Sequence, residues 1–291
     1  MTAEIFDRGY RRFEGERSGV PGAMRSLAWY TTKSMLGIGR RGRHKIFPVV
    51  VAVIAFLPTL IIFGVLALFG EGAEGLRPEY YEFLGPSETF GFLVFAHLLY
   101  ATLVAPEALV RDRRDGMLSL YLSTPLTRPT YVMAKFASVA FTMAIVVIGP
   151  AMLLLAGYTI QGRGPDGFTG WVEVFAKILL GGLIIVFVYC GVSMGVSSLT
   201  DRRAFASIAV ILTLLGLSIV ANILVLEAGM NDRLLGLDPL GTPFEAATRL
   251  FGDRGIDARN LSTTYIMMVA GGWVSAGFGT LAVRYRRLGA I

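Results

Sequence analysis

The sequence predicts an all-α polytopic membrane protein with six transmembrane helices. First, 54% of its 291 residues are hydrophobic and only 16% are charged, whereas a soluble domain has about 25% charged residues. Second, the hydrophobic residues gather into six long runs that contain no charged residue. Third, Lys and Arg concentrate in alternate segments between these runs. The composition excludes a disordered chain and disfavours an ordinary soluble enzyme.

Each run has the length of a membrane-spanning helix, which needs roughly 20 mostly apolar residues. The runs are Ile46–Gly70, Thr89–Pro106, Phe136–Gly162, Ile178–Thr200, Ala204–Leu226 and Asn260–Val283. Residues 108–110 are also apolar and extend the second run. The first run lies far from the N-terminus and precedes no small-residue cleavage site, so we expect a span there and not a signal peptide.

The charges between the runs predict the orientation of the chain, because cytoplasmic loops carry an excess of Lys and Arg. With the N-terminus inside, the inner segments hold 20 of the 27 Lys and Arg residues, and the net charge is +12 inside and −6 outside. We expect a cytoplasmic segment 1–45, a membrane domain 46–283 and a cytoplasmic tail 284–291. The overall charge of +6 is then a topology signal, and no nucleic acid partner is expected.

The N-terminal segment is too short for a domain but contains a helical pattern. Apolar and small residues recur there every three or four positions: Met24, Leu27, Ala28, Thr31, Met35 and Ile38. This spacing predicts an amphipathic helix in the inner membrane interface, with Trp29 and Tyr30 at headgroup level. Gly37, Gly39 and Gly42 would end it. A basic tail that is merely attracted to anionic lipid is the alternative.

The inner loop 107–135 contains a short apolar stretch, Met117–Leu122. It is too short to span a membrane, and Pro125 and Pro129 prevent it from continuing into the third span as one helix. Two interpretations are open on composition alone. The stretch is either a surface helix that binds a protein partner, or a loop whose apolar residues dip into lipid while the arginines enforce topology.

The fourth and fifth runs are separated only by Asp201, Arg202 and Arg203, which predicts a tight antiparallel hairpin. In the fourth run, Gly191 and Gly195 form a Gly-x-x-x-Gly pattern. Small residues at this spacing mark close helix contacts, within or between subunits. Gly271, Ser275 and Gly279 repeat the spacing in the sixth run.

The last outer loop, residues 227–259, is long for a connection and should contain structure of its own. Thr242, Pro243, Phe244 and Glu245 form a capping-box pattern with Pro at the first helical position, so we expect a helix to begin there. Phe251 extends its apolar face, which also contains Phe244, Ala247 and Thr248, and Gly252 would end it. The helix is interpreted as a cap on the spans or, more specifically, as a gate over an exit path.

Signals of catalysis are absent from the sequence. No nucleotide-binding P-loop, His-Glu-x-x-His motif or serine nucleophile elbow occurs, and the single cysteine excludes an internal disulfide. Residues 112–116 (Asp-Arg-Arg-Asp-Gly) match the opening of the signature of membrane CDP-alcohol phosphotransferases. The second pair of carboxylates is missing, so the two-metal site cannot form. We expect no catalytic, cofactor-binding or metal-binding residue in this chain.

Four polar residues lie inside the expected spans: His97, Tyr100, Ser193 and Asn222. Polar residues within a membrane are functional candidates by default. We expect these four instead to be bonded to a neighbouring helix.

The whole pattern resembles the permease subunits of type-2 ABC transporters. Six spans, a basic amphipathic N-terminal segment, a loop after the second span and a helical outer loop before the sixth are similar to that family. The most specific match is residues 105–135, where an acidic and basic turn and a Gly precede a short Leu-rich helix, Ser-x-Pro-Leu-x-Arg, Tyr131 and Lys135. Tyr10 and residues 13–17 are similar to actinobacterial members. Met117 departs from the family, which often has Thr there.

The resemblance implies a set of partners. The chain would be the transmembrane subunit of an ATP-driven transporter in the bacterial inner membrane, exporting a hydrophobic or amphipathic substrate. It would pair with a second permease subunit, as a homodimer or heterodimer, and with an ABC ATPase subunit that binds ATP and Mg. A coupling helix at residues 115–122 would seat in a groove of the ATPase.

The resemblance also implies which residues contact the ATPase. They are Asp115, Gly116, Met117, Leu118, Leu120, Tyr121, Pro125, Arg128, Asp201, Arg202 and Arg203. A non-transporting membrane scaffold or assembly factor is the alternative function. A CDP-alcohol phosphotransferase-like enzyme is a further alternative that the missing carboxylates disfavour.

Overall fold

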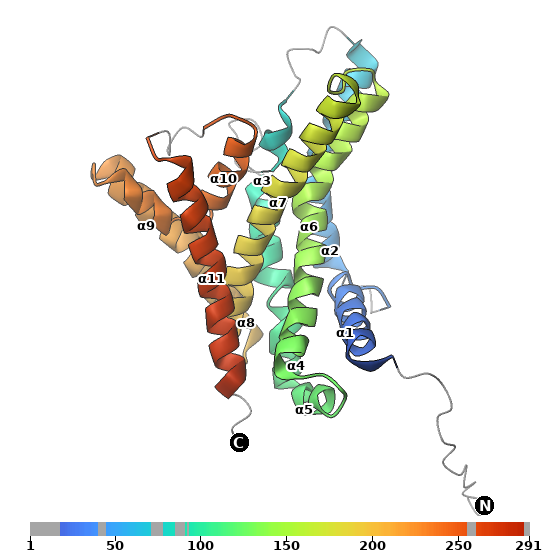
Figure 1. The fold of residues 1–291 in the computed structure, drawn as a ribbon, viewed down its shortest axis with the longest axis vertical. Helices are drawn as coiled ribbons and strands as arrows, with labels where there is room; N and C mark the ends of the chain where they lie inside the picture. Colours follow the sequence, from blue (N-terminus) through green and yellow to red (C-terminus); the bar gives the residue numbers. More distant parts are fainter. Residues whose placement is uncertain are drawn as a thin grey trace, which may run out of the picture.

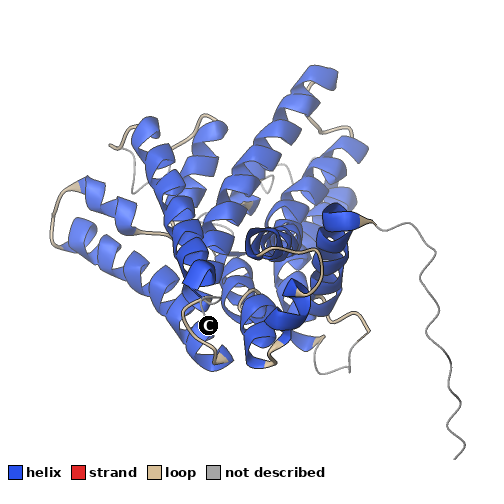
Figure 2. Ribbon diagram, turned by 60° about the horizontal axis from the view of Figure 1, so that its bottom comes forward, coloured by secondary structure: helices blue, strands red, loops and turns tan. Residues whose placement is uncertain are grey.

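A computed structural model describes residues 18–39, 45–70, 78–84, 91, 93–254 and 260–287. Within these residues all regular structure is helical and no strand occurs (Figure 2). Among the described residues, six helices are long and apolar enough to cross a membrane, and they lie where the six spans were predicted. Tyr10, residues 13–17 and Gly42, which were singled out above, lie outside the described residues.

The spans run between two ends of the molecule, which Figure 1 shows below and above. The lower end contains the short helix α5 (Met117–Leu122) and the upper end contains the helix α10 (Thr242–Leu250). The six spans are α2 (Ile46–Phe69), α3 to α4 (Leu93–Arg114), α6 (Arg128–Ile160), α7 (Gly167–Ser197), α8 to α9 (Arg203–Glu227) and α11 (Thr263–Arg287). The helix α1 (Gly19–Met35) lies beside α6 near the lower end.

Two spans are interrupted by π-helical turns. The second consists of α3 (Leu93–Leu99), a π-helical turn at Tyr100–Val104 and α4 (Glu107–Arg114). The fifth consists of α8 (Arg203–Ile211) and α9 (Leu217–Asn222), each followed by a π-helical turn, at Leu212–Gly216 and Ile223–Glu227. Such turns are rare and give no hydrophobic signal, so the sequence analysis did not anticipate them.

The helices of the third, fourth and sixth spans extend beyond the charge-free runs that predicted them. The helix α6 begins eight positions before Phe136 and includes Lys135, whose ammonium pairs with Asp112. The helix α7 includes Glu173 and Lys177, whose charges pair at 2.6 Å one turn apart. Because paired charges are tolerated in a helix, a charge-free run gives only the minimum length of a span.

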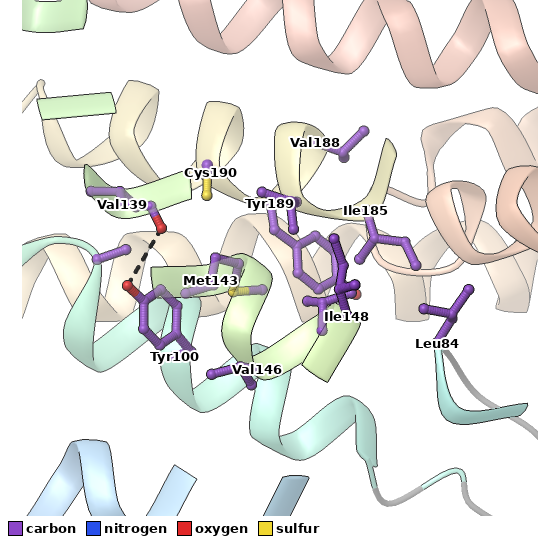
Figure 3. Packing of buried hydrophobic residues seen from close by; sticks show 14 of the residues in the cluster. Leu84, Tyr100, Val139, Met143, Val146, Ile148, Ile185, Val188, Tyr189 and Cys190 are labelled. Carbon is purple, nitrogen blue, oxygen red and sulfur yellow. Dashed lines mark hydrogen bonds between the residues drawn. The ribbon is translucent and has the colours of Figure 1, made fainter. Parts of the chain in front are cut away.

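The core of the molecule lies where α6, α7, α10 and α11 pack together. Figure 3 shows α7 residues such as Ile185 and Tyr189 against Met143 and Ile148 of α6. The Tyr100 hydroxyl donates to the Val139 carbonyl oxygen at 3.5 Å, and Ser193 donates to the Ala101 carbonyl oxygen at 2.5 Å. These two polar residues inside the spans are therefore bonded to neighbouring helices.

Glycines bring α7 and α11 into backbone contact. A Cβ placed on Gly277 would lie 2.3 Å from the carbonyl carbon of Gly191, and one on Gly195 would lie 2.9 Å from the carbonyl oxygen of Gly277. Both distances are too short for a real contact, so only glycine fits at this crossing. In contrast, a Cβ on Gly271 or Gly279 would meet nothing within 4 Å in this chain.

The N-terminal helix has the predicted face, but that face packs against protein. Leu27, Thr31 and Met35 are buried, and the Ser138 hydroxyl of α6 donates to the Ala28 carbonyl oxygen at 2.8 Å. The helix ends before Gly37, whose φ of +71° is readily adopted only by glycine. Trp29 and Tyr30 are exposed, as expected for residues that face an interface.

Candidate functional site

The α5 helix is set off from the second span by a sharp turn. Asp115 and Gly116 separate α4 from α5, and Gly116 has a φ of +66°, a left-handed conformation that favours glycine. The Ser119 hydroxyl donates to the Gly116 carbonyl oxygen at 3.2 Å. None of the residues of α5 is buried. An apolar helix is therefore held at the surface of the molecule, close to the end of the spans.

The two apolar faces of α5 differ in exposure. Leu118 and Tyr121 are half-buried against the hydrophobic core. Leu120 is 57% exposed. Of Leu118, Leu120 and Tyr121, only Leu120 exposes more than half of its surface.

Beneath α5 lies a buried ion pair between α4 and α6. The Lys135 ammonium is 2.7 Å from Asp112 Oδ2, and the two side chains are 3% and 10% exposed. The Tyr131 hydroxyl donates to the same carboxylate oxygen at 2.9 Å. A buried charge needs both a partner and hydrogen bonds, and here both come from α6. The pair therefore fixes α4 against the start of the third span.

Tyr121 connects α5 to this ion pair. Its ring centroid lies 5.7 Å from that of Tyr131 and 5.6 Å from the Lys135 ammonium. Partial burial, followed by the nearby Asp112 carboxylate, raises the pKa of Tyr121 to about 12. The phenol is therefore neutral at physiological pH and contributes packing and cation–π attraction.

Arg113 of α4 binds the C-terminal end of α7. Its guanidinium donates from Nη1 to the Ser198 carbonyl oxygen at 2.9 Å, and from Nη2 to those of Ser197 at 2.6 Å and of Thr200. Its Nε lies 2.9 Å from Asp201 Oδ1 in an ion pair. The last carbonyl groups of a helix have no partner within the helix and carry a partial negative charge. Arg113 satisfies several of them at once.

The other residues of the 201–203 turn bind back toward the second span. Arg203 Nη1 lies 3.4 Å from Glu107 Oε2, and Arg203 Nη2 donates to the Leu103 carbonyl oxygen at 3.2 Å. Arg202 is exposed and lies over the ring of Phe205. The turn and the loop after the second span, which the resemblance assigns to the same partner, therefore lie side by side.

A small cavity of about 100 Å³ separates α1 from the loop that contains α5. Tyr30 and Ser34 of α1 line one side, and Glu107, Arg111 and Asp115 line the other. Arg111 crosses the gap, because its Nη1 donates to the Ser34 hydroxyl at 3.4 Å while its Nε lies 3.5 Å from Asp115 Oδ2. The α1 helix is thus connected to the α4–α5 turn.

The segment after α5 returns the chain to the third span. Pro125 is exposed in the turn, and the start of α6 is capped by Thr127, whose backbone N–H donates to the Thr130 hydroxyl at 2.8 Å. Arg128 donates to the Arg286 carbonyl oxygen of α11 at 3.3 Å. Pro125 therefore lies in the turn outside both helices, and Arg128 connects α6 to the end of α11.

At the opposite end, α10 has the predicted bounds but a different N-terminal cap. The Thr242 hydroxyl donates to the Leu235 carbonyl oxygen at 3.3 Å, and Glu245 Oε1 lies 2.6 Å from Arg249 Nε. The predicted capping box is therefore absent. Asp238 Oδ1 instead accepts from the backbone N–H groups of Leu240 and Gly241, both at 2.8 Å. The two side chains that the capping box requires are bonded elsewhere: Thr242 to the preceding loop, and Glu245 to Arg249 one turn further along α10.

The α10 helix is buried on most sides, including its charged residues Glu245 and Arg249. Phe244 packs against His97 of α3 and Tyr189 of α7, with ring centroids 5.8 and 5.7 Å away. Pro243 is also buried, whereas Phe251 lies at the edge beside Tyr81. The α10 helix is thus packed into the core against α7 and α11, and its role as a cap or a gate stays a prediction.

Asn222, another polar residue of the spans, has its partners in its own helix and in the loop before α10, and not in a neighbouring helix as predicted. Its amide donates to the Ser218 carbonyl oxygen at 2.8 Å and to Asp238 Oδ2 at 3.3 Å. The Ser218 hydroxyl donates to Asp238 as well. Asp238 thus links α9 to the loop before α10.

The organising roles of Asp112 and Arg113 were not predicted from the sequence. Both residues belong to the incomplete enzyme motif at 112–116 and to the family match at 105–135. The pairing of Asp112 with Lys135 spans 23 positions and has no local signal. Among the described residues, no three His, Cys, Asp or Glu side chains come together in a way that could hold a metal ion.

Comparison with known proteins supplies the family. The family model described as "ABC-2 family transporter protein" matches residues 25–287. A search of the curated proteins finds no match. The matched region contains α1 from Arg25 onward, all six spans, α5 and α10, so it covers nearly the whole of the described structure.

Proposed function

The chain belongs to the ABC-2 family of transporter proteins, and we propose that it is the transmembrane permease subunit of an ATP-driven ABC transporter. In this proposal ATP and Mg bind a separate ATPase subunit. The region 46–283 is the permease domain, segments 1–45 and 284–291 are cytoplasmic, and the α5 end faces the cytoplasm. The distribution of Lys and Arg supports this orientation.

The observation that carries the proposal is that α5 is apolar, lies at the surface and is attached to the spans. No residue of this apolar helix is buried within the chain, and Leu120 is mostly exposed. Yet α5 is firmly attached below through Tyr121, Lys135 and Asp112. A rigid exposed apolar helix beside the membrane suits a protein partner better than lipid, and this favours the coupling-helix interpretation.

The second contact with the ATPase is proposed to be the 201–203 turn. Asp201 and Arg202 are exposed, and Asp201 pairs with Arg113 of α4, the helix that leads into α5. Charged residues around an apolar anchor orient a partner and raise the rate of association more than they add affinity. Leu120 would therefore supply affinity, while Arg202 and its neighbours supply orientation.

The remaining parts follow from the same proposal. We propose export of a hydrophobic or amphipathic substrate, since the spans have no charge near their centres. A second permease subunit, identical or related, would complete the pathway. The α1 helix, with Trp29 and Tyr30 exposed, would lie at the inner interface while its other face packs on α6. The buried α10 helix would act as the outer cap of each subunit.

A direct test is co-purification of the full chain with an ABC ATPase from the same organism. The Leu120→Asp variant should lose the ATPase, because the substitution places a charge in the apolar contact. The matched control is Ser123→Asp, which adds the same charge at the exposed end of α5 without removing an apolar group. Retention of the ATPase by Leu120→Asp would favour a non-transporting scaffold and contradict the proposal.

A further inference from the structure

Arg113 joins two segments of the molecule that are 85 positions apart in the sequence. Its side chain is only 5% exposed. It sits between α4, which leads into α5, and the last turn of α7, which leads into the 201–203 turn. No partner subunit is needed for this contact, because every group involved belongs to this chain.

The geometry at Arg113 suits a guanidinium better than an ammonium. Three carbonyl oxygens and one carboxylate, from Ser197, Ser198, Thr200 and Asp201, surround one planar group. The guanidinium offers five N–H groups in a rigid fork, whereas an ammonium is a compact point charge with three. A buried Arg with this many partners leaves little freedom for α4 to move relative to the end of α7.

A second ion pair also connects the 201–203 turn with α4. Arg203, which begins α8, pairs with Glu107 at the start of α4. Arg113 therefore reaches from α4 to the turn, while Arg203 reaches from the turn to α4. Arg113 is buried and has four partners, whereas the side chain of Arg203 is 42% exposed, so the first connection should dominate.

The helix that Arg113 binds, α7, extends from the α5 end of the molecule toward the α10 end. With 31 residues, α7 is about 46 Å long, and it packs against α6, α10 and α11. Its Gly181 lies against Ala247 of α10, and its Tyr189 hydroxyl donates to the Leu240 carbonyl oxygen at 3.1 Å. A displacement of the lower end of α7 would therefore act on a helix that supports α10.

We propose that Arg113 is a positioning residue for coupling. It makes α5 and the 201–203 turn move as one body with the end of α7, so that both contacts with the ATPase act on the same span. This inference rests on the proposed function for its purpose, but its structural part concerns this chain alone. Without Arg113, α5 would move with the second and third spans and leave α7 behind.

The test measures the distance between α5 and the end of α7 with spin labels. Cysteines introduced at Ser123 and Leu199, both exposed, would carry the labels, and the sole native cysteine, Cys190, is buried. The full chain in lipid nanodiscs should give one narrow distance distribution. Arg113→Ala should broaden it, and Arg113→Lys should give an intermediate width.

The matched control is Arg114→Ala. Arg114 is the next residue of α4, but its side chain is 62% exposed and pairs with Asp115. Its removal should leave the distance distribution unchanged. Asp201→Ala, which removes the carboxylate and leaves the three carbonyl oxygens, should broaden the distribution less than Arg113→Ala. Equal, narrow distributions in Arg113→Ala and Arg114→Ala would overturn the proposal.

The complex with the ATPase then separates this inference from the proposed function. In the complex with intact Arg113, the Ser123–Leu199 distance should be the same without nucleotide and after trapping with ATP and vanadate. In Arg113→Ala the complex should still form, but the distance should change on trapping. Failure of even the unsubstituted chain to bind the ATPase would contradict the proposed function, while the result in nanodiscs would still decide the role of Arg113.

Discussion

The short helices α5 and α10 connect successive spans at opposite ends of the molecule, and they differ in burial. No residue of α5 is buried, whereas most residues of α10 are, including the charged pair Glu245 and Arg249. The α5 helix is attached at one edge through Tyr121, and the α10 helix is enclosed between α7 and α11. The chain thus encloses α10 by itself and leaves α5 at its surface, where our proposal places the ATPase.

This difference predicts opposite effects of substitution at the two ends. Changes within α10 should destabilise the isolated chain, whereas changes on the exposed face of α5 should affect only its association with other subunits. Four substitutions test this expectation, from the largest expected effect to the smallest. Each is measured by thermal unfolding of the purified chain in detergent.

The largest effect is expected from Arg249→Met at the α10 end. This substitution leaves the buried Glu245 carboxylate without the partner that now lies 2.6 Å away. It also removes the donor to the Leu261 carbonyl oxygen. Removal of one partner of a buried ion pair costs roughly 3–5 kcal/mol. Arg233→Met, in the exposed part of the same loop, should have little effect, and equal stability of the two variants would contradict the enclosure of α10.

The next effect concerns the ion pair beneath α5. Lys135→Met leaves Asp112 with the Tyr131 hydroxyl as its remaining partner, and we expect a loss of about 3 kcal/mol. The double variant Asp112→Asn and Lys135→Met should recover much of this stability, because it removes both charges of the pair and leaves no charge buried without a partner. A double variant no more stable than Lys135→Met alone would show that the charges are not paired.

A smaller effect is expected where α7 meets α10. A Cβ on Gly181 would lie 3.1 Å from the Cβ of Ala247 and 3.3 Å from Leu84 Cδ1, so Gly181→Ala should lose about 1 kcal/mol through overpacking. Gly170→Ala on the same helix makes only an ordinary contact at 3.5 Å. It should instead be neutral or gain about 0.5–1 kcal/mol from helix propensity. If both variants gain stability, α10 packs less closely than the structure indicates.

The smallest effect is expected from Leu120→Ser. Because Leu120 is 57% exposed, its replacement should change the free energy of unfolding by no more than about 0.5 kcal/mol. Binding of the ATPase should nevertheless weaken in a pull-down. A large loss of stability in the isolated chain would mean that Leu120 packs within the permease, and the contrast between α5 and α10 would fail.

The sequence predicted the fold more completely than the site. The six spans and α1 follow from runs and spacings that are local in the chain. For α5 the composition left a helix and a loop open, and the family resemblance favoured the helix. The start of α10 was also predicted, but for the wrong reason, because Glu245 pairs with Arg249 and not with the backbone. For Gly191 and Gly195 the spacing indicated a close contact, but it could not indicate that Gly277 lies opposite.

The sequence by itself determined where the chain crosses the membrane, because the free energy of transfer into lipid depends on the residues of each run and little on their neighbours. It also indicated the family, through the pattern around residues 105–135. Only the tertiary structure decided which charges are buried together. The partners of Asp112 and Arg113 depend on which helices lie side by side, and this arrangement is a property of the assembled bundle that no single run contains.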